Sequence, residues 1–318
     1  MRVKFWGVRG SIPTPLTTAE LRGKIIAALQ DAVGVDLTDP AQVRAYVDGL
    51  PLFVSGMVGG NTPCVEVNIG DTLIVFDAGS GLRLLGLDLV EREPFRSGQG
   101  TVHIFLSHLH WDHIQGFPFF APAYVPGNRV LVYSPCSHFD RFLVNQQNGA
   151  YFPTPVSSMR AEVRFIPLVE GECTSVGQAS VRSIVQAHPG VSYGYRIDSE
   201  GRSLVYATDA EYSHLNQEQL QRCEDFMRGA DLLIFDAQYT LWESLFEKID
   251  WGHSSATMGV DLACRTGVKR LALFHHEPTY SDAELLDLLE DARAYQSQHP
   301  AGCSCEILIA YEGLTLKL

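Results

Sequence analysis

Four side chains that can bind metal ions lie within six consecutive positions of this 318-residue chain: His108, His110, Asp112 and His113. They follow an apolar run, Val102 to Leu106, that is typical of a buried strand. Imidazole and carboxylate groups are ligands that Zn²⁺, Mn²⁺ and Fe²⁺ accept in proteins. Alternation along the chain lets His108 and His110 point to one side while Asp112 and His113 reach another. The spacing therefore suggests two neighbouring cations.

A site for two metals needs further ligands, and the end of a strand is a good place for them because a strand positions its last side chain at a sheet edge. Three residues stand where an apolar run stops and a loop begins: His188, Asp209 and His275. The runs that precede them are Val181 to Ala187, Leu204 to Thr208, and Leu271 to Phe274. We expect these three side chains to join the first four.

Strand-like and helix-like runs alternate along the whole chain, which predicts an α/β protein with two sheets packed face to face and helices outside. We expect a single domain over 1–318, built of two halves at about 1–170 and 171–318. Leu21, Ile25, Leu29 and Val33 recur every four residues, and Asp39-Pro40 then resembles the start of another helix. A helical insert at about 17–55 is therefore predicted, which would shape the cleft or form a dimer contact.

The motif His108-x-His110-x-Asp112-His113, followed in order by His188, Asp209 and His275, resembles the metallo-β-lactamase superfamily. The resemblance implies a four-layer αββα sandwich with its metals at one edge. It also implies how the ligands divide. One metal would be held by His108, His110 and His188, the other by Asp112, His113 and His275, and Asp209 would bridge them.

Other positions refine the resemblance. No cysteine takes a ligand position, so β-lactamases with a cysteine ligand match poorly, and oxygen-reducing relatives carry Glu where His110 stands. The segment Trp251-Gly252-His253-Ser254-Ser255 is similar to the His-Ser/Thr segment of the branch that includes ribonuclease Z and cyclic phosphodiesterases. Phe76-Asp77-Ala78-Gly79 looks like the early aspartate-glycine turn of the superfamily.

The chemistry we expect is hydrolysis of a phosphodiester by a hydroxide that bridges two divalent cations, Zn²⁺ first, with Mn²⁺ or Fe²⁺ as alternatives. His253 would give a proton to the leaving alkoxide, since an unprotonated sugar oxygen leaves poorly. Asp112 would also steer the nucleophile. Asp77 would hold a metal-binding imidazole or its loop in place. Asn61 would touch the substrate or form a turn.

The charge of the chain narrows the substrate. Lys and Arg number 24 against 37 Asp and Glu, a formal net charge of −13 that disfavours stable binding to DNA or tRNA. We expect a small anionic substrate, a small or cyclic nucleotide by preference. Three alternatives stay open: an acyl hydrolase such as a lactonase or thioesterase, a tRNA 3′-processing endoribonuclease, and a non-catalytic protein that binds a phosphorylated ligand.

Composition sets the remaining expectations. No membrane span or secretion signal is visible, so a cytoplasmic location is expected. Seven scattered cysteines favour reduced thiols over a disulfide framework, and Cys303 and Cys305 are expected to be buried or incidental thiols. A homodimer is compatible with the sequence.

Overall fold

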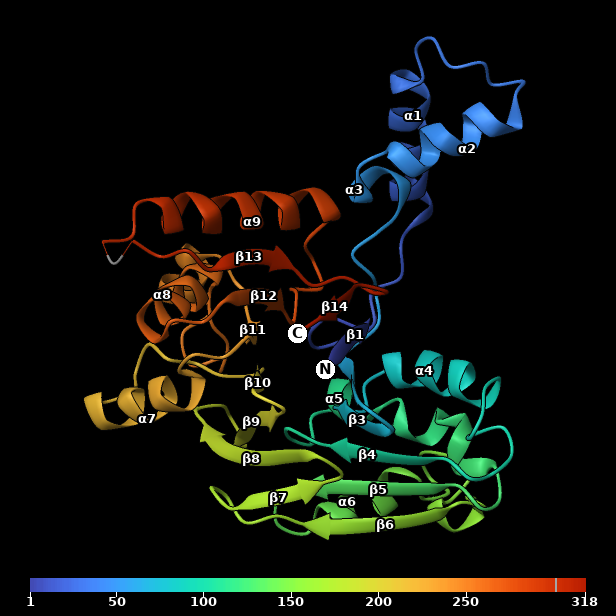
Figure 1. The fold of residues 1–318 in the computed structure, drawn as a ribbon, viewed down its shortest axis with the longest axis vertical. Helices are drawn as coiled ribbons and strands as arrows, with labels where there is room; N and C mark the ends of the chain where they lie inside the picture. Colours follow the sequence, from blue (N-terminus) through green and yellow to red (C-terminus); the bar gives the residue numbers. More distant parts are fainter. Residues whose placement is uncertain (301) are drawn as a thin grey trace.

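The first of two seven-stranded sheets holds the N-terminal strands of the chain. The computed structural model describes residues 1–300 and 302–318, and Figure 1 shows its arrangement. The strand order is β14-β1-β2-β3-β4-β5-β6, antiparallel from β14 to β3 and parallel from β3 to β6. The strands are β1 (Arg2–Gly7), β2 (Cys64–Ile69), β3 (Thr72–Phe76), β4 (Thr101–Phe105), β5 (Arg129–Ser134), β6 (Glu162–Pro167) and β14 (Thr315–Lys317).

The second sheet has the same mixed pattern, in the order β13-β12-β11-β10-β9-β8-β7. It is antiparallel from β7 to β10 and parallel from β10 to β13. Its strands are β7 (Cys173–Val176), β8 (Ala179–Gln186), β9 (Ser192–Ser199), β10 (Arg202–Ala207), β11 (Leu232–Asp236), β12 (Arg270–Phe274) and β13 (Glu306–Ile309). The chain leaves the first sheet at Pro167 and enters the second at Cys173, and its last strand returns to pair with β1.

Helices cover the outer face of each sheet. Leu82 and Leu85 of α4 and Phe139 of α6 pack on the first sheet, while α7, α8 and α9 bury their apolar faces against the second. The helices are α4 (Gly81–Val90), α5 (Trp111–Ile114), α6 (Phe139–Gln146), α7 (Gln217–Met227), α8 (Ala256–Thr266) and α9 (Asp282–Ser297). This confirms the αββα sandwich. Among the described residues, no helix is both long and apolar enough to cross a bilayer.

Alternating residues of β3 show how one strand serves two layers. Leu73 and Val75 join the cluster under the helices of the first sheet, whereas Ile74 and Phe76 face the second sheet. The Phe76 ring stacks on Tyr206 of β10, with centroids 4.9 Å apart, and on Tyr195 of β9, with centroids 5.6 Å apart. An aromatic column therefore joins the two sheets near the strand ends.

The predicted helices of the insert form, but their apolar stripe does not pack on the sandwich. Figure 1 shows α1 (Thr18–Asp31) and α2 (Pro40–Gly49) projecting from the body above the short α3 (Leu52–Ser55). None of their residues is buried, and Leu29 is 60% exposed. Lys24 connects α1 to the body through an ion pair with Asp282 of α9, 2.7 Å long.

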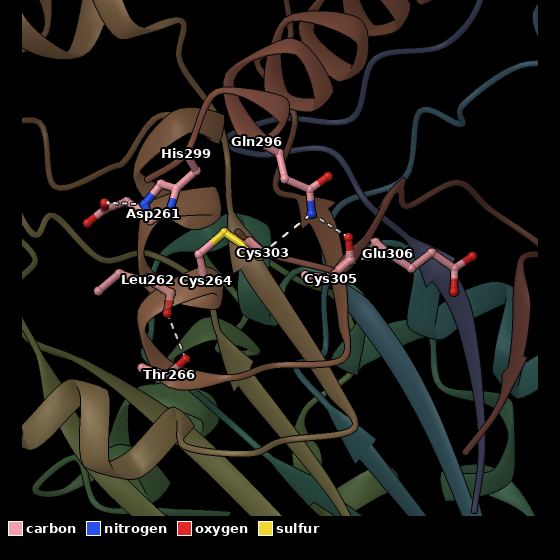
Figure 2. Close-up of a disulfide and its surroundings, with 9 residues drawn as sticks. All are labelled: Asp261, Leu262, Cys264, Thr266, Gln296, His299, Cys303, Cys305 and Glu306. Carbon is pink, nitrogen blue, oxygen red and sulfur yellow. Dashed lines mark hydrogen bonds and ion pairs between the residues drawn. A yellow bond between two sulfur atoms is a disulfide. The ribbon is translucent and has the colours of Figure 1, made fainter. Parts of the chain in front are cut away.

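The expectation of reduced cysteines is wrong for one pair. Cys264, in the last turns of α8, forms a disulfide with Cys303, which precedes β13 (Figure 2). Helices α8 and α9 pack together, and the chain after α9 passes close enough to bring the two Cα atoms within 5.0 Å. A separation of 39 residues hid this pairing from the sequence. The cytoplasmic location stays a prediction, without support from the cysteines.

The aromatic column yields a stability prediction. Phe76 is fully buried, so we expect Phe76→Ala to lower the free energy of unfolding by about 3–5 kcal/mol, the usual cost of such a cavity. Chemical denaturation with a circular-dichroism readout measures it. Val33→Ala is the control, because Val33 is 89% exposed and its loss should change stability little. A loss below about 1 kcal/mol for Phe76→Ala would contradict this packing.

Candidate metal centre

The seven residues predicted to bind metal lie together, at the edge where strands of both sheets end. His108 and His110 precede α5, Asp112 and His113 lie in α5, and the other three follow β8, β10 and β12. Their potential ligand atoms form two groups, each within 4.8 Å: His108, His110, His188 and Asp209 in one, and Asp112, His113, Asp209 and His275 in the other. Asp209 belongs to both groups, which is the arrangement that a shared ligand requires.

The backbone turns sharply where three of these strands end. Asp77 after β3, Asp209 after β10 and His275 after β12 have φ values of 59°, 52° and 61°. This left-handed region is costly for residues other than glycine, and it persists where the surrounding structure enforces it. Three such residues, one from the first sheet and two from the second, indicate a site whose geometry is maintained at the expense of local stability.

In the first group, three imidazoles converge on one carboxylate. His188 Nε2 lies 3.1 Å from His110 Nδ1 and 3.7 Å from Asp209 Oδ2, and His108 Nε2 lies 3.5 Å from the same oxygen. Among the described residues, His108 Nε2 has no hydrogen-bond partner although it is buried. Burial lowers the pKa of all three imidazoles, that of His108 most strongly, and so favours the neutral form that binds metals.

The second group is more tightly packed and more acidic. His113 Nε2 lies 3.1 Å from Asp112 Oδ2, 3.2 Å from Asp209 Oδ1 and 3.3 Å from His275 Nε2. Burial would raise the pKa of Asp112 and Asp209, but the neighbouring histidines, His113 above all, hold both well below the usual range. Buried ionised carboxylates need compensating positive charge. Both groups therefore fit divalent cations in donor type, burial and charge.

Asp77 orients the second group without belonging to it. Its Oδ2 accepts a hydrogen bond from His113 Nδ1 at 2.8 Å and another from the Tyr206 hydroxyl at 2.7 Å. Its Oδ1 accepts from the Ser107 amide at 2.7 Å. A carboxylate behind a ligating imidazole fixes the ring and its tautomer. The contact with His113 is compatible with the role expected for Asp77, which stays a prediction.

Other supports were not predicted from sequence. Gln238 Oε1 lies 3.0 Å from His275 Nδ1, and the Gly252 carbonyl lies 2.8 Å from His188 Nδ1. Gly252 has φ of +85°, and a Cβ there would stand 2.3 Å from the His188 ring, so only glycine fits. The Ser11 amide donates to Asp112 Oδ2 at 2.8 Å. Of these supports, only Gly252 could have been noticed in the sequence, because it directly precedes His253. Gln238 and Ser11 lie too far along the chain from His275 and Asp112 for their contacts to be inferred.

His253 lies beside both groups and has a carboxylate partner of its own. Its Nδ1 is 2.8 Å from Asp236 Oδ2, and its ring stacks on that of His275 with centroids 5.0 Å apart. Burial lowers the pKa of His253, but Asp236 outweighs burial and raises it to about 9. A cleft of about 450 Å³ gives access to His253, Asp112, Asp209 and His275.

Asn61, a candidate for substrate contact, lies outside the cleft. Its side-chain amide donates to Glu312 Oε2 at 3.0 Å, and its carbonyl oxygen accepts from the Ser80 hydroxyl at 2.9 Å. Its backbone carbonyl accepts from the amides of Val8 and Arg9. These bonds tie together loops behind the cleft, and Asn61 is not among the residues lining it. They favour the turn role over substrate contact.

The shared carboxylate makes a quantitative prediction. We expect protein purified without chelator to carry two divalent ions per chain, His188→Ala to retain about one, and Asp209→Ala to retain fewer than one, because Asp209 belongs to both groups. Elemental analysis measures this. His138→Asn, at an exposed position outside both groups, is the control. Equal metal content in Asp209→Ala and wild-type protein would contradict the assignment.

Comparison with known proteins finds relatives in sequence and in fold. A Ribonuclease Z from Thermoplasma acidophilum is 26% identical over 281 residues, covering 73% of this chain and 85% of the relative. Among solved structures, the metallo-β-lactamase fold protein YhfI from Bacillus subtilis has a TM-score of 0.65 at 17% identity, covering 99% of this chain and 98% of that one. A diphosphatase from the PhnP family has a TM-score of 0.59 at 21% identity, covering 100% and 97%.

These likenesses support both the superfamily and the ribonuclease Z branch expected from the sequence. Divalent metal ions are what this fold implies, and the histidine and aspartate clusters fit them. Residues 72–276, more than half of the chain, match the family described as Beta-lactamase superfamily domain, and the chain belongs to that family.

Proposed function

We propose that this protein is a dinuclear metal-dependent phosphodiesterase that hydrolyses a small or cyclic nucleotide. The observation that carries the proposal is Asp209, whose carboxylate reaches both groups of potential ligands and thereby makes one centre of them. The Ribonuclease Z relative, named for an activity on RNA, adds support for a phosphodiester substrate. The formal net charge of −13 and a cleft of about 450 Å³ favour a small substrate over a folded RNA.

Charge at the centre suits a phosphodiester. Two divalent ions, with Zn²⁺ favoured by the five imidazoles, would bring +4, and Asp112 and Asp209 bring −2, which leaves +2. When bound, the ions would polarise phosphate oxygens and activate water. The buried carboxylates of Asp112 and Asp209 line the cleft and would hold the ions there, and the Asp112 carboxylate could orient the attacking water.

His253 is placed to protonate the leaving group. It lines the cleft, and its Nδ1 is engaged by Asp236, so Nε2 is the nitrogen free to act on a substrate. The Asp236 carboxylate raises the pKa of the ring to about 9, which favours its protonated form, and the contact fixes the ring's orientation. A protonated imidazole can donate to a departing alkoxide, which otherwise leaves poorly. An acyl hydrolase whose leaving group binds a metal has no need of such a donor.

The general-acid role is tested with two leaving groups. We expect His253→Ala to lower kcat on 3′,5′-cyclic AMP by about 10² to 10⁴ and to affect bis(4-nitrophenyl) phosphate far less, because nitrophenolate leaves without protonation. Metal content should be unchanged. Phe246→Ala serves as control, since Phe246 is 62% exposed and does not line the cleft. Equal losses on both substrates would remove His253 from proton donation.

The reaction class is tested by a substrate panel on metal-loaded protein. We expect hydrolysis of cyclic nucleotides and of bis(4-nitrophenyl) phosphate, and little on lactones, thioesters or precursor tRNA. Processing of precursor tRNA with no activity on cyclic nucleotides would assign the protein to tRNA 3′ maturation. Turnover confined to lactones or thioesters would make it an acyl hydrolase. Tight nucleotide binding without turnover of any substrate would make it a binding protein.

A further inference from the structure

A second cavity, of about 700 Å³, adjoins the metal centre. Leu109 and Trp111 line both this cavity and the cleft, so the two spaces share a wall. The segment from His108 to His113 carries both residues together with four of the potential metal ligands. A ligand whose charged group sits at the metals could therefore extend past Trp111 into the second cavity. Its volume lies in the range of cavities that take small molecules.

The wall of this cavity is aromatic and carries no charge. Trp111, Phe119, Phe142 and Tyr151 line it and are 83%, 53%, 56% and 76% exposed, while Phe152 packs edge-on against Phe119. The remaining lining residues are aliphatic or carry uncharged amides. Large exposed aromatic side chains gathered on one surface indicate a binding site. Their π-faces suit a flat ring, because rings stack on aromatic side chains whatever their substituents.

Polar groups in the wall favour a heteroaromatic ring over an alkyl chain. Gln146 of α6 lines the cavity, and its Nε2 donates to the Ile114 carbonyl at 3.0 Å. Its Oε1 is buried, and no donor within the described part of the chain bonds to it. Leaving such an acceptor unpaired costs free energy. If the amide turned to present Oε1 to the cavity, giving up its bond to Ile114, a ring N–H or amino group could pair with that oxygen, which an alkyl chain cannot do.

We propose that this aromatic cavity binds the nucleobase of the substrate while the phosphate occupies the metal centre. The inference rests on the proposed phosphodiesterase function and adds the place where the base is recognised. The sugar would span the shared wall at Leu109 and Trp111. Tyr151 and Phe142 would then be specificity residues that act on affinity for the base and not on the chemical event, since neither lines the cleft at the metals.

The test compares two ligands that differ only in the base. AMP and ribose 5-phosphate share sugar and phosphate, and calorimetry on the metal-loaded protein measures their binding without any turnover. We expect AMP to bind about tenfold more tightly, and Tyr151→Ala and Phe142→Ala each to reduce AMP affinity about fivefold or more while leaving ribose 5-phosphate unchanged. Both residues are well exposed, so the variants should fold. Phe246→Ala is the matched aromatic control and should change neither affinity.

A kinetic experiment distinguishes failure of the base site from failure of the proposed phosphodiesterase function. The 4-nitrophenyl phosphodiesters of thymidine, octanol and methanol share one leaving group, and the thymidine ester should have the lowest KM. Equal affinity for AMP and ribose 5-phosphate, or an octyl ester as good as the thymidine ester, would overturn the base site while leaving phosphodiesterase activity intact. Tighter AMP binding that depends on Tyr151 without hydrolysis of any ester would support the cavity and refute the proposed function.

Discussion

Two ionised carboxylates, Asp112 and Asp209, are buried among five imidazoles at one edge of the sandwich. Burying such a carboxylate is expensive unless positive charge stands beside it, and the nearest imidazoles, those of His113 and His275, are each shared by both carboxylates. Cations held in the two groups of ligands would supply the missing charge. As a purely structural core, this cluster would cost folding free energy. As a cation-binding site, it is what the ligand chemistry requires, and contacts from the surrounding structure hold it in place.

The sandwich supplies that organisation from both sheets. The potential ligands of the first sheet lie on the β4–α5 segment, and those of the second follow β8, β10 and β12. Side chains at the carboxyl ends of parallel strands are free to face a common crevice, because the hydrogen bonds of the sheet end there. The Phe76, Tyr195 and Tyr206 rings join the sheets, and the hydroxyl of Tyr206 reaches Asp77. Tyr206 thus packs between the two sheets and also helps to position Asp77, which contacts His113.

Much of this was accessible from the sequence, and for a local reason. The His108 to His113 segment carries four potential ligands in six positions, and the apolar runs before His188, Asp209 and His275 mark strand ends. The clustering of all seven and the αββα layers follow from such patterns. Their division into two ligand sets was implied by family resemblance, and the distances agree with it.

What the sequence could not provide are contacts between segments that carry no pattern of their own. Gln238 against His275, Ser11 against Asp112, and the disulfide from Cys264 to Cys303 depend on how loops pass one another in space. The aromatic cavity escaped for the same reason, because its residues come from α5, α6 and the loops beside them. The apolar stripe of α1 correctly indicates a helix, but a helical period does not say what the stripe packs against, and no residue of α1 is buried.

The central claim is that the seven side chains hold two ions. Anomalous X-ray diffraction from crystals of zinc-loaded protein, recorded at the zinc edge, locates the ions directly. The account predicts two peaks about 3.5–4 Å apart, one within about 2.0–2.2 Å of ligand atoms from His108, His110 and His188 and the other of Asp112, His113 and His275, with Asp209 touching both. A single peak, or peaks away from these residues, would contradict it.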